Sequence, residues 1–102
     1  MEPVFQAIAE PTRRALLARL RSAPELTLGE LSDPLAMTRQ AVSKHLDVLA
    51  GAGLIEVQWR GREKFHRLNA APLREVGDWL APYAAAWDRR LERLERHLEE
   101  NA

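Results

Sequence analysis

Hydrophobic residues recur every three or four positions through the first half of the chain, a spacing that predicts short amphipathic helices. We expect one helix over residues 3–9, with Val4, Phe5 and Ile8 on one side. A second helix is expected over residues 11–22, because proline is favoured at the first helical position and an apolar stripe follows it. Each helix therefore has one face suited to a core or to another chain.

A capping-box sequence marks the start of a third helix. Thr27 and Glu30 have the spacing at which each side chain can bind the backbone N–H of the other residue. The apolar side of this helix carries three leucines, Leu28, Leu31 and Leu35. Pro34 lies near the end of the helix and helps to stop it, since proline has no backbone N–H to donate.

A fourth helix over about residues 38–52 separates an apolar face from a polar one. Thr38 is a suitable N-cap, and two glycines mark the C-terminal end. At 100° per residue, Val42, Leu46 and Leu49 fall within a narrow arc. The opposite face is polar and comprises Gln40, Lys44 and Asp47, with Ser43 beside them and His45 at the boundary.

The segment that follows has the period of two that is typical of strands. Apolar and polar residues alternate over 55–59, which predicts a half-buried strand. Gly61 lies between two arginines and supplies a tight turn, because glycine readily takes positive φ. After this turn, residues 64–68 are expected to form a second strand that pairs with the first. Two aromatic side chains are expected to anchor this hairpin to the body of the domain, Trp59 and Phe65.

A long helix is expected over about residues 72–100, with a kink or interruption at Pro82. Its apolar seam is longer than one small core could cover, and comprises Leu73, Val76, Leu80, Tyr83, Trp87, Leu91, Leu94 and Leu98. Mixed charges flank the seam as they do on paired helices, so we expect a second chain to cover it; the alternative is packing within one chain. The expected dimer interface comprises Val4, Phe5, Ile8, Leu80, Tyr83, Trp87, Leu91, Leu94 and Leu98.

The composition is that of one small globular domain, residues 1–102. Hydrophobic residues make up 46% of the chain and charged residues 29%, which is ordinary for such a domain. Cysteine is absent, which excludes disulfides, thiolate metal sites and a cysteine nucleophile. No apolar run approaches the ~18 residues of a membrane span, and the first residues lack the features of a signal peptide. We therefore expect a cytoplasmic protein with no membrane partner.

The net charge is zero, but basic residues gather in one part of the chain. Residues 36–67 carry six of them against three acidic residues, and the basic ones are Arg39, Lys44, Arg60, Arg62, Lys64 and Arg67. Charge separated in this way gives a local positive face. A polar-faced helix followed by an arginine-rich hairpin can fill a DNA major groove and grip the flanking phosphates. The sequence therefore predicts binding to double-stranded DNA.

Each expected DNA contact follows from side-chain chemistry. Gln40 can pair with two edge atoms of adenine, and Arg39 or Lys44 can donate to guanine O6 and N7. The hydroxyl groups of Ser43 and Thr38 can donate to phosphate, although Thr38 can instead serve only as a cap. Further candidates are His45, as a phosphate donor or a packed boundary residue, and Arg60, Arg62 and Lys64 at or near the hairpin tip. The alternative is a solvated helix face and a hairpin whose charges confer only solubility.

Three stretches of the chain together resemble a known family. PTRRALLARL, LTLGEL and TRQAVSKHLDVLAGAGLIEVQWRGREKFHRLN are similar to the ArsR-type winged helix-turn-helix repressors, over nearly the whole chain. The expected fold is then mainly α with a small β-hairpin, in the order α-α-α-α-β-β-α. Residues 38–52 would be the recognition helix, 54–68 the wing and 72–100 the dimerisation helix. The resemblance also implies a homodimer built on the first and last helices, a pseudo-palindromic operator, and repression relieved by a small effector, often a metal ion.

The metal-sensing residues of that family are missing. One branch has Cys-x-Cys on the third helix, where this chain reads Thr27-Leu28-Gly29. Another uses Asp-x-His and a later His-x-x-Glu on the last helix. His97 and Glu100 match the second half of this pattern, whereas the first half falls on two alanines, Ala84 and Ala86. Two ligands per chain are too few to hold a tetrahedral ion well unless other groups join them, so we expect no metal site and no cofactor.

Other functions and controls stay open from the sequence alone. A winged-helix module that binds proteins rather than DNA is supported by the zero net charge. A DNA-bound regulator can be controlled by a partner protein, or by a small organic effector among Trp79, Tyr83 and Trp87, although such aromatics more often form dimer core. Catalysis is not predicted, because the three histidines lie on different elements and no phosphate loop or nucleophile motif accompanies them.

Overall fold

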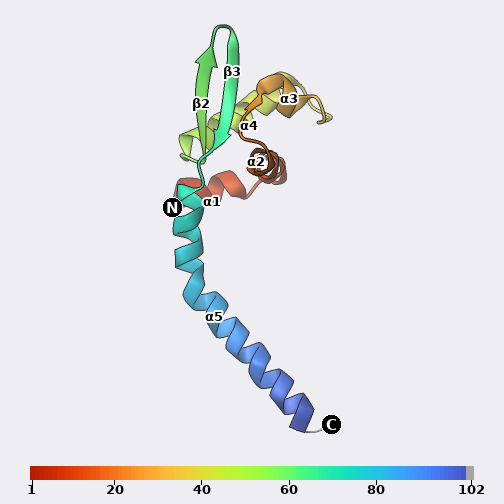
Figure 1. Ribbon diagram of the computed structural model, residues 1–102, viewed down its shortest axis with the longest axis vertical. Helices are drawn as coiled ribbons and strands as arrows, with labels where there is room; N and C mark the ends of the chain where they lie inside the picture. Colours follow the sequence, from red (N-terminus) through yellow and green to blue (C-terminus); the bar gives the residue numbers. More distant parts are fainter. Residues whose placement is uncertain (101–102) are drawn as a thin grey trace.

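Helices and a short sheet form a body from which one long helix departs in the computed structural model, which describes residues 1–100. The elements are α1 (Glu2–Ile8), α2 (Pro11–Ser22), β1 (Leu26–Thr27), α3 (Leu28–Ser32), α4 (Arg39–Gly51), β2 (Ile55–Arg60), β3 (Glu63–Leu68) and α5 (Ala71–Glu100). Figure 1 shows α1 to α4 grouped beside the hairpin, with α5 running away from them. The extents of 66 × 26 × 22 Å reflect that projecting helix. The last two residues of the expected domain lie outside the described residues.

The core lies where the apolar faces of the first four helices meet the base of the hairpin. Its buried hydrophobic residues are Val4, Ala7, Leu16, Leu17, Leu20, Leu31, Val42, Leu46, Leu49, Leu54, Ile55 and Val76. The apolar arc predicted for the fourth helix is therefore confirmed. Val4, however, belongs to the chain's own core, whereas Phe5 and Ile8 on the same helix are only partly buried.

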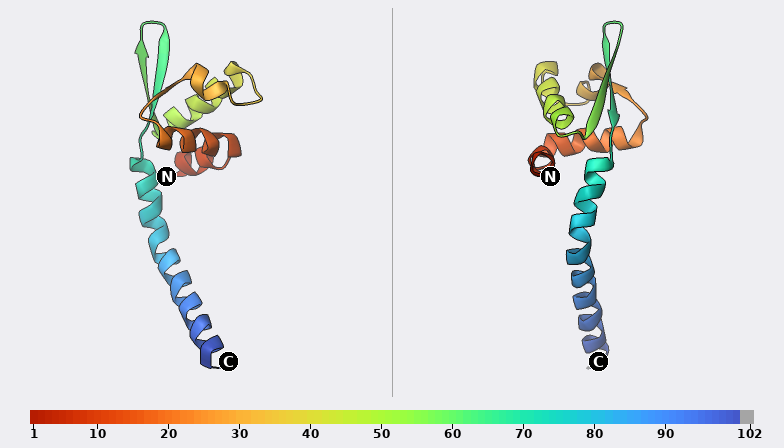
Figure 2. Two further views of the ribbon diagram at one scale, coloured as in Figure 1. Left: turned by 45° about the vertical axis from the view of Figure 1, so that its right-hand side comes forward. Right: turned by 90° about the vertical axis from the view of Figure 1, so that its left-hand side faces the viewer.

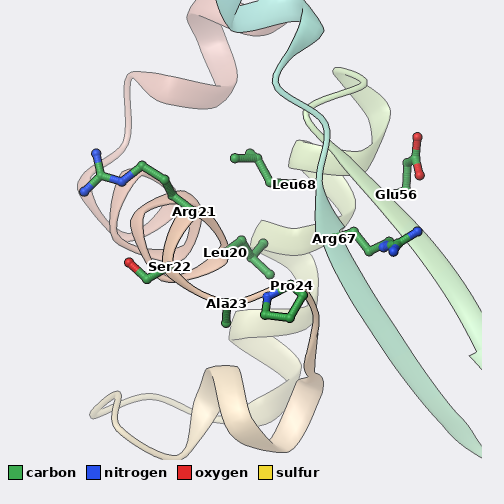
Figure 3. Close-up of a pocket in the computed structure, with 8 residues that line it drawn as sticks. All are labelled: Leu20, Arg21, Ser22, Ala23, Pro24, Glu56, Arg67 and Leu68. Atoms are coloured by element: carbon green, nitrogen blue, oxygen red, sulfur yellow. The ribbon is translucent and has the colours of Figure 1, made fainter.

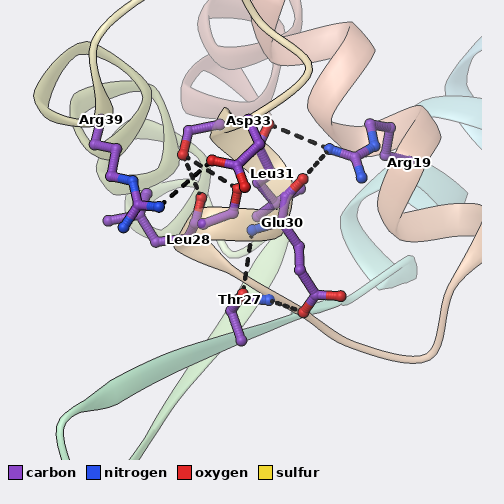
Figure 4. A network of polar contacts seen from close by, with 9 residues as sticks. Arg19, Thr27, Leu28, Glu30, Leu31, Asp33 and Arg39 are labelled. Carbon is purple, nitrogen blue, oxygen red and sulfur yellow. Dashed lines mark hydrogen bonds and ion pairs between the residues drawn. The ribbon is translucent and has the colours of Figure 1, made fainter.

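The predicted capping box at the start of α3 is present (Figure 4). The Thr27 hydroxyl accepts the Glu30 N–H at 3.2 Å, and the Thr27 N–H donates to the Glu30 carboxylate at 3.0 Å. The helix ends at Ser32, so the expectation that it carries Leu35 is wrong. Pro34 cannot donate to the Glu30 carbonyl, which instead accepts a hydrogen bond from Arg19 at 2.6 Å.

A third strand was missed by the sequence pattern. β1 has only two residues, too few for a period to be recognised, and it pairs antiparallel with β3 to give the order β1-β3-β2. Leu26 lies opposite His66, whose side chain is only 2% exposed. The His66 Nδ1 lies 3.0 Å from the Leu26 carbonyl oxygen and donates to it, since that oxygen can only accept. This bond ties the short strand to the hairpin.

The hairpin has the predicted tight turn but extends beyond the body. Arg60 pairs with Glu63 across a two-residue loop in which Gly61 has φ +62°. Of the apolar residues expected to be buried on β2, only Ile55 is buried, and Trp59 is 63% exposed. The expectation that Trp59 anchors the hairpin is therefore wrong, because β2 is exposed beyond Ile55 and Trp59 lies outside the buried core. Phe65 is half-buried.

α5 is continuous for 30 residues through Pro82, and Figures 1 and 2 show it bending without a break. Its first turns contact the body through Val76, which is buried, and Leu73, which is partly buried. Beyond them the apolar seam is exposed, with values between 41% and 64% at Leu80, Tyr83, Trp87, Leu91, Leu94 and Leu98. In the part of the chain that the structure describes, no helix is long and apolar enough to cross a bilayer.

Candidate nucleic-acid interface

The polar face of α4 is presented to solvent, as its sequence predicts. The Thr38 hydroxyl accepts the Ala41 N–H at 3.1 Å and so caps the helix. With the opposite face packed into the core, Gln40 and Lys44 are exposed, and Ser43 is half-buried between the two faces. The helix therefore holds an amide and an ammonium group on a rigid, outward-facing surface.

Arg39 begins α4 and lies against α3. Its Nη2 is 3.4 Å from the Asp33 carboxylate, and both side chains are largely exposed (Figure 4). A Cβ added at Gly29 would lie 3.2 Å from the same Nη2, so glycine leaves room for the guanidinium there. An exposed ion pair of this kind contributes about 0–1 kcal/mol, so Arg39 can exchange Asp33 for another acceptor.

His45 lies at the boundary of α4 and turns towards α2. Its Nδ1 is 3.2 Å from Nη1 of Arg13 and 3.7 Å from the carboxylate of Glu10. Glu10 is the N-cap of α2 and accepts the Arg13 N–H at 2.9 Å. Desolvation opposes ionisation of Glu10, but it is outweighed by hydrogen bonds from the Arg13 and Thr12 amides, with smaller effects of the His45 ring and the Thr12 hydroxyl, and the pKa of Glu10 lies below the ordinary value. His45 is thus packed at the boundary of α4, and its expected role as a phosphate donor stays a prediction.

Arg60 is held at the base of the turn rather than projecting from it. It makes a bidentate pair with Glu25, at 2.6 and 2.9 Å, and lies 4.5 Å from the centre of the Phe65 ring. The hydrogen bond from Arg60 lowers the pKa of Glu25. Arg62, in the two-residue loop, is exposed, and Lys64 lies over the Trp59 ring at 5.3 Å.

Strand alternation explains which hairpin residues face α4. Trp59 and Lys64 are cross-strand partners, and they lie on the same face of the hairpin as Ile55, the buried residue at the base of β2. Arg60 lies on the opposite face of the hairpin, where its guanidinium pairs with Glu25. Arg62 follows in the turn. Sequence reasoning grouped Arg60, Arg62 and Lys64, and the register separates the first from the others.

A hollow of about 270 Å³ lies between the hairpin and the start of α4. Its lining comprises Thr27, Leu28, Gly29, Arg39, Trp59, Arg62, Glu63 and Lys64. Three cations from separate elements, together with the exposed indole, therefore border one space. Sequence reasoning missed Trp59 here, because its place in an alternating strand favoured burial.

A second, open hollow of about 580 Å³ lies between the end of α2 and the hairpin (Figure 3). It is lined by Leu20, Arg21, Ser22, Ala23, Pro24, Glu56, Arg67 and Leu68. Figure 3 shows Arg21 directed away from Arg67, so the two guanidinium groups do not converge. The lining offers no arrangement that indicates a ligand.

The donor set does not fit the metal sites that the resemblance implies. The third-helix stretch of Thr27 to Gly29 offers no thiolate, and Ala84 and Ala86 on α5 have no donor atoms. Within residues 1–100, no group of three or more His, Cys, Asp or Glu side chains is placed to hold a metal ion. The side chains at these positions therefore match neither of the two metal-sensing patterns.

The exposed seam of α5 continues onto α1 through a row of aromatic rings. The centre of the Trp79 ring lies 5.6 Å from that of Phe5, edge to face, and 5.3 Å from that of Tyr83. Trp79, Tyr83 and Trp87 are all exposed, although aromatic residues favour buried or interface positions. An apolar surface of this length on a single chain marks an interaction site.

Known proteins share both the sequence and the fold. Residues 8–58 match the family described as a helix-turn-helix domain. The HTH-type transcriptional regulator YuzN of Bacillus subtilis is 37% identical, over 74% of this chain and 88% of that protein. The transcriptional repressor SdpR of the same species is 30% identical, over 78% and 88%. An ArsR-like transcriptional regulator from Rhodococcus sp. RHA1 superposes with a TM-score of 0.75 at 34% identity, covering 97% of this chain and 90% of the other.

Proposed function

Because this chain belongs to the ArsR-type winged helix-turn-helix regulators, we propose that it is a homodimeric repressor whose two α4 helices read a pseudo-palindromic DNA operator. The observation that carries this proposal is the exposed polar face of α4 beside a hairpin with free cations. The relatives are transcriptional regulators and not enzymes, in agreement with the sequence prediction. SdpR is named as a repressor, which supports the direction of control.

In this proposal α4 is the recognition helix and supplies the base contacts. Gln40 can accept from N6 and donate to N7 of adenine, and Lys44, one turn further along, can donate to guanine. Arg39 can leave the weak Asp33 pair for guanine or for a phosphate. The capping role of Thr38 uses its hydroxyl oxygen as an acceptor, which leaves the hydroxyl proton free to donate to a phosphate.

The wing contributes Arg62, Lys64 and Trp59 in place of Arg60. All three line the hollow that faces the start of α4, so a DNA backbone crossing that hollow would meet cations on two sides. The indole of Trp59 can pack against a sugar while Arg62 and Lys64 neutralise phosphates. Arg60 serves instead to hold the wing to Glu25.

The dimer forms through α5 and α1. The exposed seam runs from Leu80 to Leu98, and Phe5 and Ile8 extend the same surface at the body end. Burying apolar surface stabilises association by about 25 cal/mol per Å². Most of the apolar seam of α5 is not buried by its own chain and is therefore available for association. Two-fold symmetry then places the two α4 helices about 34–36 Å apart, one turn of DNA.

Selection of bound duplexes from a random pool tests the proposal directly. We expect enrichment of a pseudo-palindrome and, at ~0.15 M salt, affinity ~10³-fold or more above that for unrelated DNA. Gln40→Ala with Lys44→Ala should abolish this preference. Arg96→Ala, which removes a cation from the far end of α5, should keep it. Equal affinity for every duplex would overturn the proposal.

A protein-binding module of the same fold is the second candidate, and the zero net charge favours it. The two candidates differ in their dependence on wing cations. Arg62→Ala with Lys64→Ala should weaken DNA binding and reduce its dependence on salt, because fewer counterions are released. Binding of a protein partner need not respond in this way.

A further inference from the structure

One guanidinium joins α1, α2 and α4 where these helices meet. Arg13, in the first turn of α2, donates from Nε to the Ala7 carbonyl at 2.6 Å and from Nη2 to the Gln6 carbonyl at 3.0 Å. Both carbonyls belong to the C-terminal end of α1, where backbone acceptors lose their usual helical partners, and the Gln6 carbonyl also accepts the Ala9 N–H at 3.4 Å. The third contact, from Nη1, reaches Nδ1 of His45 on α4 at 3.2 Å.

The chemistry of this contact assigns a donor and an acceptor to its two partners. A guanidinium has donors only, so Nδ1 of His45 must accept the hydrogen bond from Arg13. In this contact the ring proton is on Nε2. The Glu10 carboxylate lies 3.7 Å from the same Nδ1, which is beyond hydrogen-bond distance, so Arg13 is the partner of this nitrogen.

These contacts connect the two surfaces that the function requires. α1 carries Phe5 and Ile8, which belong to the dimer surface, and His45 follows Lys44 on the recognition helix. We propose that Arg13 and His45 are positioning residues that hold α4 at a set place relative to α1, so that dimer assembly aligns the two reading helices. This inference rests on the proposed function for its DNA readout, whereas the state of the imidazole can be tested without DNA.

Arg14 offers a matched control within the same helix. Its Nη1 donates to the Ile8 carbonyl at 2.8 Å, at the same end of α1. Among the polar contacts of the described residues, its side chain reaches α1 and not α4. Replacing Arg14 therefore removes a similar cation and a similar bond to α1 while leaving the link to His45 in place.

The first test is the tautomer of His45 in the free protein, read from the nitrogen resonances of the ring by NMR. We expect an unprotonated Nδ1 and a protonated Nε2 at neutral pH. Arg13→Ala should remove this preference and Arg14→Ala should keep it. A protonated Nδ1 in the unmodified protein would overturn the proposal, because it excludes the hydrogen bond from Arg13.

The second test is affinity for the selected operator at protein concentrations at which every variant is a dimer. Arg13→Ala and His45→Ala should each weaken binding about tenfold, and the double variant should be no weaker than the more affected single one. His45→Asn should retain most of the affinity, because its amide oxygen can accept near the position of Nδ1. Arg14→Ala should remain within about twofold of the unmodified protein.

Two further comparisons make the outcome decisive. The slope of affinity against salt should be unchanged in Arg13→Ala, whereas removing a cation that touches a phosphate would reduce it by about 0.9. If Arg13→Ala fails to fold, Arg13→Lys and the His45 variants carry the same comparison. An unmodified protein without any DNA preference would refute the proposed function and leave the tautomer result standing. Equal weakening of DNA binding in Arg13→Ala and Arg14→Ala would overturn the positioning role.

Discussion

His45 and His66 carry the same imidazole but use Nδ1 in opposite ways. In His45 this nitrogen accepts from Arg13, and in His66 it donates to the Leu26 carbonyl. His66 is also enclosed at the centre of the small sheet, and this burial lowers its pKa below the ordinary value. The role of Nδ1 is thus set by a donor side chain in His45 and by a backbone carbonyl in His66.

The burial of His66 predicts a stability that falls in mild acid. Because its pKa is lower in the folded chain, the unfolded chain binds a proton first as the pH drops below about 6.5. The free energy of unfolding should therefore decrease below that pH, by at most about 1.4 kcal/mol per pH unit for one proton. Urea unfolding at pH 7.5, 6.5 and 5.5, at one fixed protein concentration, measures it.

His66→Gln supplies the comparison for that measurement. Glutamine does not titrate, so this variant should lose less stability between pH 7.5 and 5.5 than the unmodified protein, although it is less stable at pH 7.5. Parallel pH profiles for the two proteins would contradict this explanation of the role of His66.

For single residues, the sequence predicted chemistry better than placement. Gln40 and Lys44 were correctly assigned to the exposed face, because helical periodicity places them opposite a core arc. Trp59 was expected to anchor the hairpin because it belongs to an alternating strand, and Arg60 was grouped with Arg62 and Lys64 at or near the tip. The expectation for Trp59 is wrong, since its side chain is exposed. Arg60 does flank the turn, but its pairing with Glu25, 35 residues away, could not be predicted from its neighbours in sequence.

Among the helices and strands, strong local signals located the helices and the hairpin. The capping box at Thr27 and the positive φ of Gly61 are local features, and both are confirmed. β1 depends instead on pairing with β3, a contact between distant segments that leaves no period in two residues. The premature end of α3 combines a local cause, Pro34, with a distant one, the hydrogen bond from Arg19.

The register of the wing predicts different roles for its two arginines. Arg62→Ala should reduce the slope of log affinity against log salt by about 0.9 for each phosphate that Arg62 neutralises. Arg60→Ala should leave that slope nearly unchanged, because its guanidinium is engaged by Glu25. Both slopes can be measured by titrating labelled operator DNA between about 0.05 and 0.2 M salt, a range over which affinity for DNA depends strongly on salt.

The same titration with Glu25→Gln provides the control. Removing the carboxylate releases Arg60, so DNA affinity should stay level or rise. If the slope of log affinity against log salt changed more in Arg60→Ala than in Arg62→Ala, Arg60 would face the phosphates. The assignment from the alternation of faces along the strand would then be wrong.

In the molecule as a whole, α5 determines the elongated shape, and the proposed dimer depends on it. Most of its apolar seam is exposed, so an isolated chain would leave several large hydrophobic side chains in water. The sequence predicted this seam from its spacing of three and four. It also predicted a kink or an interruption at Pro82, and the helix continues through that residue without interruption. The covering chain could not be deduced from one sequence, and it stays a prediction.

Two substitutions on one turn of α5 test this assembly. Leu94→Glu places a charge in the seam and should convert the dimer to monomers in analytical ultracentrifugation. Arg96→Glu introduces the same side chain about 200° around the helix and should leave the dimer intact. Dimers that persist in Leu94→Glu, or dissociate equally in both variants, would place the contact elsewhere.

The proposed function depends on one dimer reading two half-sites through its paired α4 helices. A hydroxyl-radical footprint on the selected operator, combined with the mass of the complex, examines both parts of this arrangement at once. We expect two chains per duplex and two protected segments whose centres lie about 10–10.5 base pairs apart, or a multiple of that spacing. One chain bound to a single protected segment, or a uniform footprint without boundaries, would show that the dimer does not read DNA in this way.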